Sequence, residues 1–384
     1  MIYFAILFLL FSASFYIDIL KIKKHENIIY YFFMFFLILL AGLRFRVGSD
    51  TITYLSNFQQ CPKLFNLLDS DFSRYNYKPL WMIYFSIFKT YGNFYLLQLS
   101  NAFLINFAIF RFGIKYCNDF KFIYILLYYS LFYIGLNFEI MRQALAIALC
   151  IKAIDYLIHK GYLKYYVLII IGSLIHEGAL IFFILPLVSL VKLNNRTSII
   201  IIILLFLLSA FFTQYLLYAS LYFVQVLGDT NLNEKYNIYS ATNGKVNLNY
   251  YLNYMYIPIF LVLSSIIYLT KKKVKIPFYN YLVLFSCVSV LSSGFIILGR
   301  FSSSLFIFPL LCISKTLYIC INKIRSFIVY CMLYVVIILS QLIYYNAKFA
   351  DYKFYNKYYP YSSCFNEFYD YKRESQVDAS SLFK

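Results

Sequence analysis

The chain has 384 residues, of which 62% are hydrophobic, 22% aromatic and only 13% charged. Soluble domains usually carry about 25% charged and about 45–50% apolar residues. This composition therefore excludes a cytosolic enzyme, a disordered protein and a disulfide-stapled secreted domain. The net charge of +18 does not indicate a nucleic-acid partner, because the basic residues lie in short clusters between apolar runs, as in the cytoplasmic loops of membrane proteins. We expect an all-α polytopic integral membrane protein embedded in the lipid bilayer.

Apolar runs that could cross a bilayer recur along the chain. A helix needs about 20 mostly apolar residues to span about 30 Å of hydrocarbon, and fewer where the bilayer thins. The runs lie near residues 3–20, 28–43, 94–112, 122–138, 142–158, 163–191, 197–220, 251–270, 278–298, 301–321 and 326–345. Lysines at 21, 23 and 24 follow the first run and no basic residue precedes it. The positive-inside rule therefore places the N-terminus outside the cell.

The run at 163–191 decides the number of crossings. If it crossed once, the four-lysine cluster at 271–275 would face the exterior, against the positive-inside rule. A break at His176-Glu177 instead gives two short crossings, about 163–175 and 177–191, and keeps the later basic clusters in the cytoplasm. We therefore predict about 12 transmembrane helices, with both termini extracytoplasmic.

Three stretches are predicted to lie outside the bilayer. Residues 44–93 include an amphipathic part that would lie along the interface. Residues 221–250 are rich in Asn, Tyr and Gly, which indicates an external loop. Residues 345–384 form a polar extracytoplasmic tail of nearly balanced charge. The sequence shows no fixed-period repeat, so residues 1–384 are predicted to form a single integral membrane domain.

Charged residues at the external ends of the predicted helices are not explained by topology. Each costs free energy near the bilayer, about 2.5–3.5 kcal/mol for an arginine at its centre. A convergent set of arginines on one side predicts an anionic ligand at the outer leaflet, because a guanidinium donates two parallel hydrogen bonds to a phosphate. The charged residues in question are Arg44, Arg46, Asp50, Glu139, Arg142, His176, Glu177 and Arg300.

Each of these residues also has a structural interpretation. Arg44 would cap the end of the second crossing and reach the headgroups. Glu139 and Arg142, three residues apart, would pair on one helix face. His176 would be a satisfied core residue, and Arg300 a membrane anchor.

Signatures of nucleotide and metal chemistry are missing from the sequence. It contains no P-loop, no G-x-S-x-G, no H-E-x-x-H and no EF-hand pattern. The eight cysteines lack C-x-x-C spacing and the three histidines are scattered. We therefore predict neither a metal site nor a cofactor.

Two blocks of sequence carry a family resemblance. The first is Gly42-Leu43-Arg44, followed by Val47-Gly48-Ser49-Asp50-Thr51 and Tyr54. The second runs from Met141-Arg142-Gln143-Ala144-Leu145-Ala146 through Ser173-Leu174-Ile175-His176-Glu177-Gly178-Ala179-Leu180-Ile181 to Pro186. The chain thereby resembles the EpsG family of exopolysaccharide proteins, which is related to Wzy-type O-antigen and capsule polymerases. Gly299-Arg300 is similar to a third, weaker block, but Leu305-Phe306 stand where the family tends to have a tyrosine.

The resemblance implies a GT-C-like membrane glycosyltransferase of the bacterial cytoplasmic membrane. Such enzymes polymerise oligosaccharide repeat units carried on undecaprenyl diphosphate at the outer face. A chain-length regulator and a flippase of the same pathway are expected partners. In this scheme Arg44, Arg46, Arg142 and Arg300 bind the diphosphate leaving group. Glu139, Asp50 and His176 are alternative bases for the attacking hydroxyl, and the scheme uses neither a metal nor ATP.

Three rival functions remain compatible with the sequence. A flippase of lipid-linked oligosaccharide also suits twelve crossings, but it should carry ionisable residues deep in the membrane. A non-catalytic component of an export complex would tolerate loss of single external arginines. A ligase that transfers the glycan to a lipid core would share both donor and mechanism with a polymerase.

Overall fold

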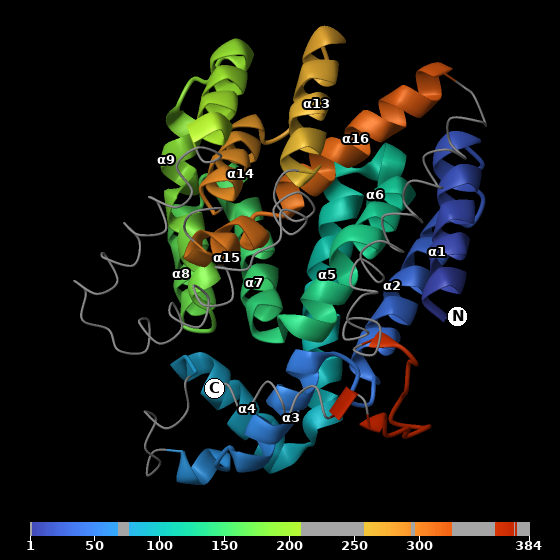
Figure 1. Ribbon diagram of the computed structural model, residues 1–384, viewed down its shortest axis with the longest axis vertical. Coiled ribbons are helices and arrows are strands. Elements are labelled where there is room, and N and C mark those ends of the chain that lie inside the picture. Colours follow the sequence, from blue (N-terminus) through green and yellow to red (C-terminus); the bar gives the residue numbers. More distant parts are fainter. Residues whose placement is uncertain are drawn as a thin grey trace. The chain divides into compact units, whose positions relative to one another are not determined.

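The computed structural model describes residues 2–67, 77–208, 257–292, 296–324, 358–371 and 373–374 (Figure 1). Within these ranges every regular element is helical, and the only β-type pairings are isolated bridges at Ser363. The all-α prediction is therefore confirmed for the described residues. The predicted loop 221–250 and crossing 326–345 lie outside them, as do parts of the predicted crossings 197–220 and 251–270. The chain divides into two compact units, Met1–Ala179 with Leu317–Lys384, and Leu180–Thr316.

The first unit is built on four long helices that pack against one another in the order α2, α5, α7 and α8. Its elements are α1 (Ile2–Ala13) with the π-helical η1 (Ser14–Ile19), α2 (Glu26–Gly42), α3 (Ser49–Gln60), the 3₁₀ turn η2 (Leu64–Asn66), α4 (Pro79–Tyr91), α5 (Phe94–Tyr116), the 3₁₀ turn η4 (Asn118–Phe120), α6 (Lys121–Tyr128), the π-helical η5 (Tyr129–Tyr133) and η6 (Gly135–Glu139), α7 (Met141–Ile158) and α8 (Tyr162–Ser173). Helix α2 packs along α5, α5 along α7, and α7 along α8. Figure 1 shows α3 and α4 beyond one end of these longer helices.

The remaining described helices include those of the second unit. They are the 3₁₀ segment η7 (Glu177–Ile184), α9 (Leu185–Leu190), a helix at Asn195–Leu208, α13 (Ile257–Lys271), α14 (Tyr279–Leu291), α15 (Ile296–Ser304) and α16 (Ile307–Ile324). A core of Ile202, Ile259, Val283 and Val290 joins three of them.

The hydropathy of the described helices indicates an integral membrane protein. Ile2–Ile19 and Phe94–Tyr116 are each long and apolar enough to cross a bilayer. Leu298–Ser304 and Ile307–Ile321 are long and apolar enough only when taken together, as one span bent by 50°. Shorter apolar helices are Glu26–Gly42, Tyr162–Ser173, Glu177–Leu190, Asn195–Leu208, Leu261–Lys271 and Tyr279–Leu291. The number of twelve crossings stays a prediction.

The predicted break in the apolar run at 163–191 is confirmed. Helix α8 ends at Ser173 and η7 begins at Glu177. The backbone N–H groups of Ile175 and His176 both donate to the carbonyl of Gly172, at 3.1 and 2.9 Å, and so close the end of α8. That each of the two segments crosses the membrane stays a prediction.

A closed ring of polar side chains holds η6 against α5 and α6. The Asn106 amide donates to Asn137 Oδ1 at 2.8 Å, and the Tyr128 hydroxyl donates to Asn106 Oδ1 at 2.9 Å. The Asn137 amide donates in turn to the Tyr128 hydroxyl at 3.0 Å and to the Tyr133 carbonyl at 2.8 Å. Because these buried groups satisfy one another, the ring avoids the cost of unpaired polar atoms. It thereby fixes the segment that leads to Glu139.

We predict that Gly42→Ala destabilises the protein by about 1–3 kcal/mol. Gly42 ends α2 directly against α5, and a Cβ at this position would stand 2.7 Å from the Cα of Leu99. The two helix backbones would therefore have to move apart. Thermal unfolding of the purified protein in detergent measures the effect.

Gly135→Ala is the matched control, because a Cβ there meets no atom within 4 Å in the part of the chain that the structure describes. Equal unfolding temperatures for the two variants would contradict the close packing of α2 on α5.

Candidate functional site

Arg44 organises the loop between α2 and α3. Its side chain is 1% exposed. The guanidinium donates to the carbonyls of Ala41 and Val47, the latter at 3.2 Å. It also donates to the hydroxyl of Thr51 at 3.0 Å and to the sulfur of Met141 at 3.0 Å. Burial lowers the pKa of Arg44 to about 10, so the side chain stays charged at neutral pH.

This environment favours a cap at the helix end over direct contact of Arg44 with a diphosphate, but the buried side chain does not reach toward the headgroups. The N–H groups face acceptors of the chain itself, and the ring of Phe138 lies 4.8 Å from the guanidinium carbon. A buried charge satisfied in this way gives position rather than ligand contact. It ties the end of α2 to α3 and to the beginning of α7.

Thr51 and Gly48 bring α3 against η6. The Thr51 hydroxyl accepts from Arg44 and donates to the Phe138 carbonyl at 2.9 Å. Gly48 has a φ of +98°, and a Cβ there would stand 2.9 Å from the same carbonyl oxygen. Only glycine combines this backbone conformation with so close an approach.

Glu139 holds the beginning of α3. Its Oε2 accepts a hydrogen bond of 3.2 Å from the backbone N–H of Asp50, in the first turn of that helix. A carboxylate is favourable there because the N–H groups at a helix start lack partners within the helix. The side chain of Asp50 is itself exposed.

The ion pair between Glu139 and Arg142 that helical spacing favours is not formed. Ile140, with φ −98° and ψ 46°, separates η6 from α7, so the two charged residues do not share one continuous helix. No ion pair joins them among the described residues.

Arg142 is a cation placed where the local structure does not favour one. It is the second residue of α7, and a positive charge at a helix N-terminus costs about 0.3–1 kcal/mol. Its Nε is buried without a hydrogen-bond partner within the described ranges, which costs about 1–3 kcal/mol more. A bound anion would remove both costs. Arg142 is therefore the best-placed anion ligand among the described arginines of the first unit.

The aromatic side chain of Tyr77, just before α4, lies beside Arg142 and contacts further rings from α3 and α4. The guanidinium carbon is 5.0 Å from the centre of the Tyr77 ring. Tyr77 stacks on Tyr54 at 6.4 Å, and Tyr54 meets Trp81 edge to face at 5.8 Å. Trp81 is 0% exposed, and its Nε1 has no partner in the described part of the chain. These rings limit the water near Arg142, which strengthens its attraction for an anion.

His176 lies in the break between α8 and η7 and is 4% exposed. Its Nδ1 accepts a hydrogen bond of 2.9 Å from the N–H of Gly178. The proton of the neutral ring is therefore on Nε2, which stands 3.8 Å from Glu177 Oε1. The Leu80 N–H donates to the Leu174 carbonyl at 3.2 Å and ties the break to α4. His176 thus fits a hydrogen-bond donor better than a base.

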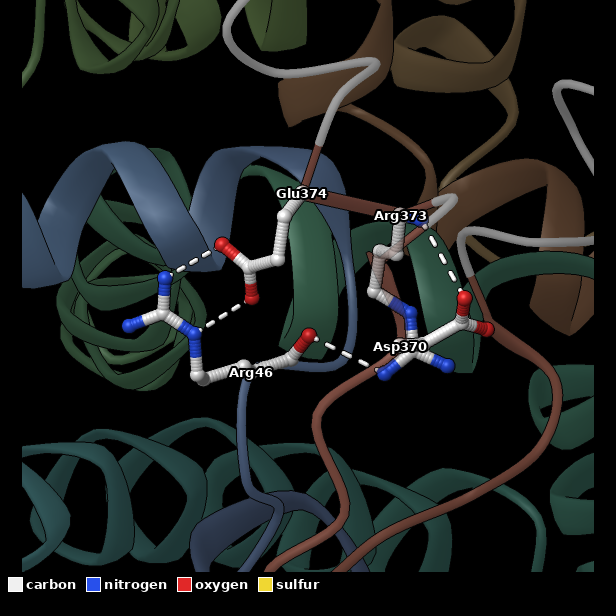
Figure 2. A network of polar contacts seen from close by, with 4 residues as sticks. All are labelled: Arg46, Asp370, Arg373 and Glu374. Carbon is white, nitrogen blue, oxygen red and sulfur yellow. Dashed lines mark hydrogen bonds and ion pairs between the residues drawn. The ribbon is translucent and has the colours of Figure 1, made fainter.

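Arg46 is paired with the C-terminal segment, which we define as residues 358–371 and 373–374. Figure 2 shows its guanidinium facing the carboxylate of Glu374, with which it forms two hydrogen bonds. These bonds raise the pKa of Arg46 above its usual value. A carboxylate thus occupies the side of Arg46 that a diphosphate would need.

Arg300 belongs to the second unit and to α15. Its side chain is half-buried, and its backbone carbonyl accepts from the hydroxyls of Ser303 and Ser304 at 3.0 and 2.9 Å. Because Arg142 lies in the other unit, the convergence of these two arginines stays a prediction.

Sequence reasoning missed Tyr77, Trp81 and Glu374. Trp81 is the only tryptophan of the chain, which is a usable signal. Glu374 carried no signal, since nothing in the polar tail indicates its partner. Among the described residues, no group of three or more His, Cys, Asp and Glu side chains is placed to hold a metal ion.

The comparisons with known proteins identify a family. A family model described as the EpsG family matches residues 27–363. This range contains the α2–α3 loop, Glu139, Arg142, His176 and Arg300, and it ends within the C-terminal segment. No curated protein and no solved structure matches the chain.

We predict that Thr51→Val destabilises the protein by about 1–3 kcal/mol, the cost of leaving a buried donor and a buried acceptor unpaired. Valine keeps the shape of threonine but cannot accept from Arg44 or donate to Phe138. Thr51→Ser retains the hydroxyl and should unfold at a temperature closer to that of the wild type. An unfolding temperature of Thr51→Val equal to that of the wild type would contradict the contribution of these hydrogen bonds.

Proposed function

Since the chain belongs to the EpsG family, a family of Wzy-like polymerases, we propose that it is a polysaccharide polymerase acting on undecaprenyl-diphosphate-linked repeat units. The reaction takes place at the outer face of the bacterial cytoplasmic membrane. A hydroxyl of the incoming repeat unit attacks the anomeric carbon of the growing glycan. A glycosidic bond forms, the bond to the lipid diphosphate breaks, and the hydroxyl proton passes to a base.

The observation that carries this proposal is the environment of Arg142. Its guanidinium is charged, faces the ring of Tyr77 and has a buried N–H without a partner among the described residues. A diphosphate gains charge as it leaves, and a preorganised donor in a water-poor site stabilises that charge. The N-terminus of α7 favours the same anion. Arg300 is the proposed second ligand.

The carboxylates have separate roles in this proposal. Glu139 caps α3 through the backbone of Asp50, so it acts in positioning. Asp50 is exposed and is the proposed base for the attacking hydroxyl. His176 donates from Nε2 to a phosphate oxygen. Arg44 positions the loop that carries Asp50, and Arg46 fastens that loop to the C-terminal segment.

A purified-protein assay tests the reaction itself. The protein is reconstituted with lipid-diphosphate repeat units and no ATP, and we expect a ladder of glycans. Movement of the substrate across the vesicle membrane without glycosidic bonds would identify a flippase instead. When a different lipid core is added as a second acceptor, a single transfer onto that core would identify a ligase.

We predict that Arg142→Ala lowers the polymerisation rate by about 100-fold to 1,000-fold, the loss typical of one transition-state donor. Single repeat units on lipid should accumulate while protein abundance stays normal. Arg142→Lys should recover only part of the rate, because lysine lacks the planar fork.

Arg111→Ala is the matched control. Arg111 is exposed in the last turns of α5, and its guanidinium carbon lies 5.8 Å from the centre of the Phe107 ring. The control should make glycans of normal length. Normal glycans from Arg142→Ala as well would exclude the proposed role of Arg142.

A further inference from the structure

The C-terminal segment is joined to the α2–α3 loop by its backbone. The Phe45 N–H donates to the Ser362 carbonyl at 2.8 Å, and the Ser362 hydroxyl donates to the Phe45 carbonyl at 2.7 Å. The Cys364 N–H donates to the Leu43 carbonyl at 2.9 Å. The segment therefore follows residues 43–45 as a short antiparallel partner.

Charged side chains fix the far end of the segment to the same loop (Figure 2). Arg46 and Glu374 form the paired contact already described. Arg373 donates to the Arg46 carbonyl at 3.1 Å and to the Pro360 carbonyl at 2.7 Å. Its backbone N–H faces the carboxylate of Asp370 at 3.4 Å. The segment is thus held at both ends.

Together with the predicted crossing at 28–43, these contacts give the expected height of the segment relative to the bilayer. The apolar helix α2 ends at Gly42, and the segment pairs with residues 43–46 directly beyond it. A residue bound to the first turn outside an apolar helix lies at the level of the lipid headgroups. This placement holds whichever side of the membrane the loop faces.

The surface that the segment presents is aromatic. Phe365 and Tyr371 are each 84% exposed, and Phe368 and Tyr369 are exposed as well. Tyr369 also packs edge to face on Phe45, with ring centres 5.1 Å apart. Four exposed aromatic rings within seven residues are typical of an interaction surface.

We propose that residues 365–371 form a lipid-binding surface that sits at the interface between headgroups and acyl chains. Phenylalanine is apolar enough to enter this region, and tyrosine is enriched there because its ring is apolar and its hydroxyl stays wet. The carboxylates of Glu367 and Asp370 remain in the aqueous headgroup layer. The surface lies beyond residue 363, where the family match ends, and the proposal does not depend on the proposed reaction.

Tryptophan fluorescence in vesicles tests this surface. The chain has one tryptophan, Trp81, which is 0% exposed, so the wild type supplies the background spectrum. Phe365→Trp in the full-length protein is reconstituted into phosphatidylcholine vesicles with or without bromine atoms near the headgroup end of the acyl chains. We expect the added emission to be blue-shifted and to lose intensity in the brominated vesicles.

Tyr371→Trp is a second probe, in case the first variant does not fold. Tyr358→Trp is the matched control on the buried side of the same segment, where Tyr358 is 2% exposed, and it should keep its intensity in brominated vesicles. Unchanged emission from the probes at 365 and 371 in brominated lipid would overturn the proposal. Quenching by iodide then shows what surrounds the probe instead of lipid. A probe that faces water is quenched by iodide, whereas a probe covered by a second protein copy is shielded from it.

Discussion

The candidate site depends on the hydrogen bonds of the buried Arg44 guanidinium. It joins the end of α2, the beginning of α3 and Met141 at the start of α7. A charge removed from water must find strong acceptors, so these segments are held together by a group that cannot be left unpaired. The position of Asp50, Glu139 and Arg142 follows from this contact and from the Thr51 bond to Phe138.

The arginines of the first unit differ in what their neighbours leave available. Arg44 is satisfied by carbonyls, a hydroxyl and a sulfur, and Arg46 by a carboxylate. Arg142 keeps a buried donor without a partner among the described residues. Residues whose local interactions are unfavourable for folding are more often found at functional sites than elsewhere. The geometry therefore indicates that Arg44 and Arg46 hold the site together, whereas Arg142 is placed to bind an anion.

Hydropathy and charge predicted the helical class, the membrane setting and the break at His176, because these properties depend on local composition. The roles of the single arginines could not be predicted in this way. Arg44 and Arg142 look alike in sequence, each at the end of an apolar run, and only the tertiary structure shows which one is satisfied. The pairing of Arg46 with Glu374 spans 328 residues, and no local pattern encodes such a contact. The prediction that Glu139 and Arg142 share one helix face likewise failed, because the non-helical Ile140 separates them.

The attachment of the C-terminal segment to the α2–α3 loop has a consequence for biosynthesis. The loop leaves the ribosome before its partners, because Ser362 and Glu374 lie 317 and 328 residues after the loop residues that they bind. The helices on either side of the loop, α2 and α3, are therefore synthesised long before its hydrogen-bond partners exist. A nascent chain that stops before residue 362 would carry the loop without these partners, so the loop reaches its final hydrogen-bonded form only after residue 374 has been added.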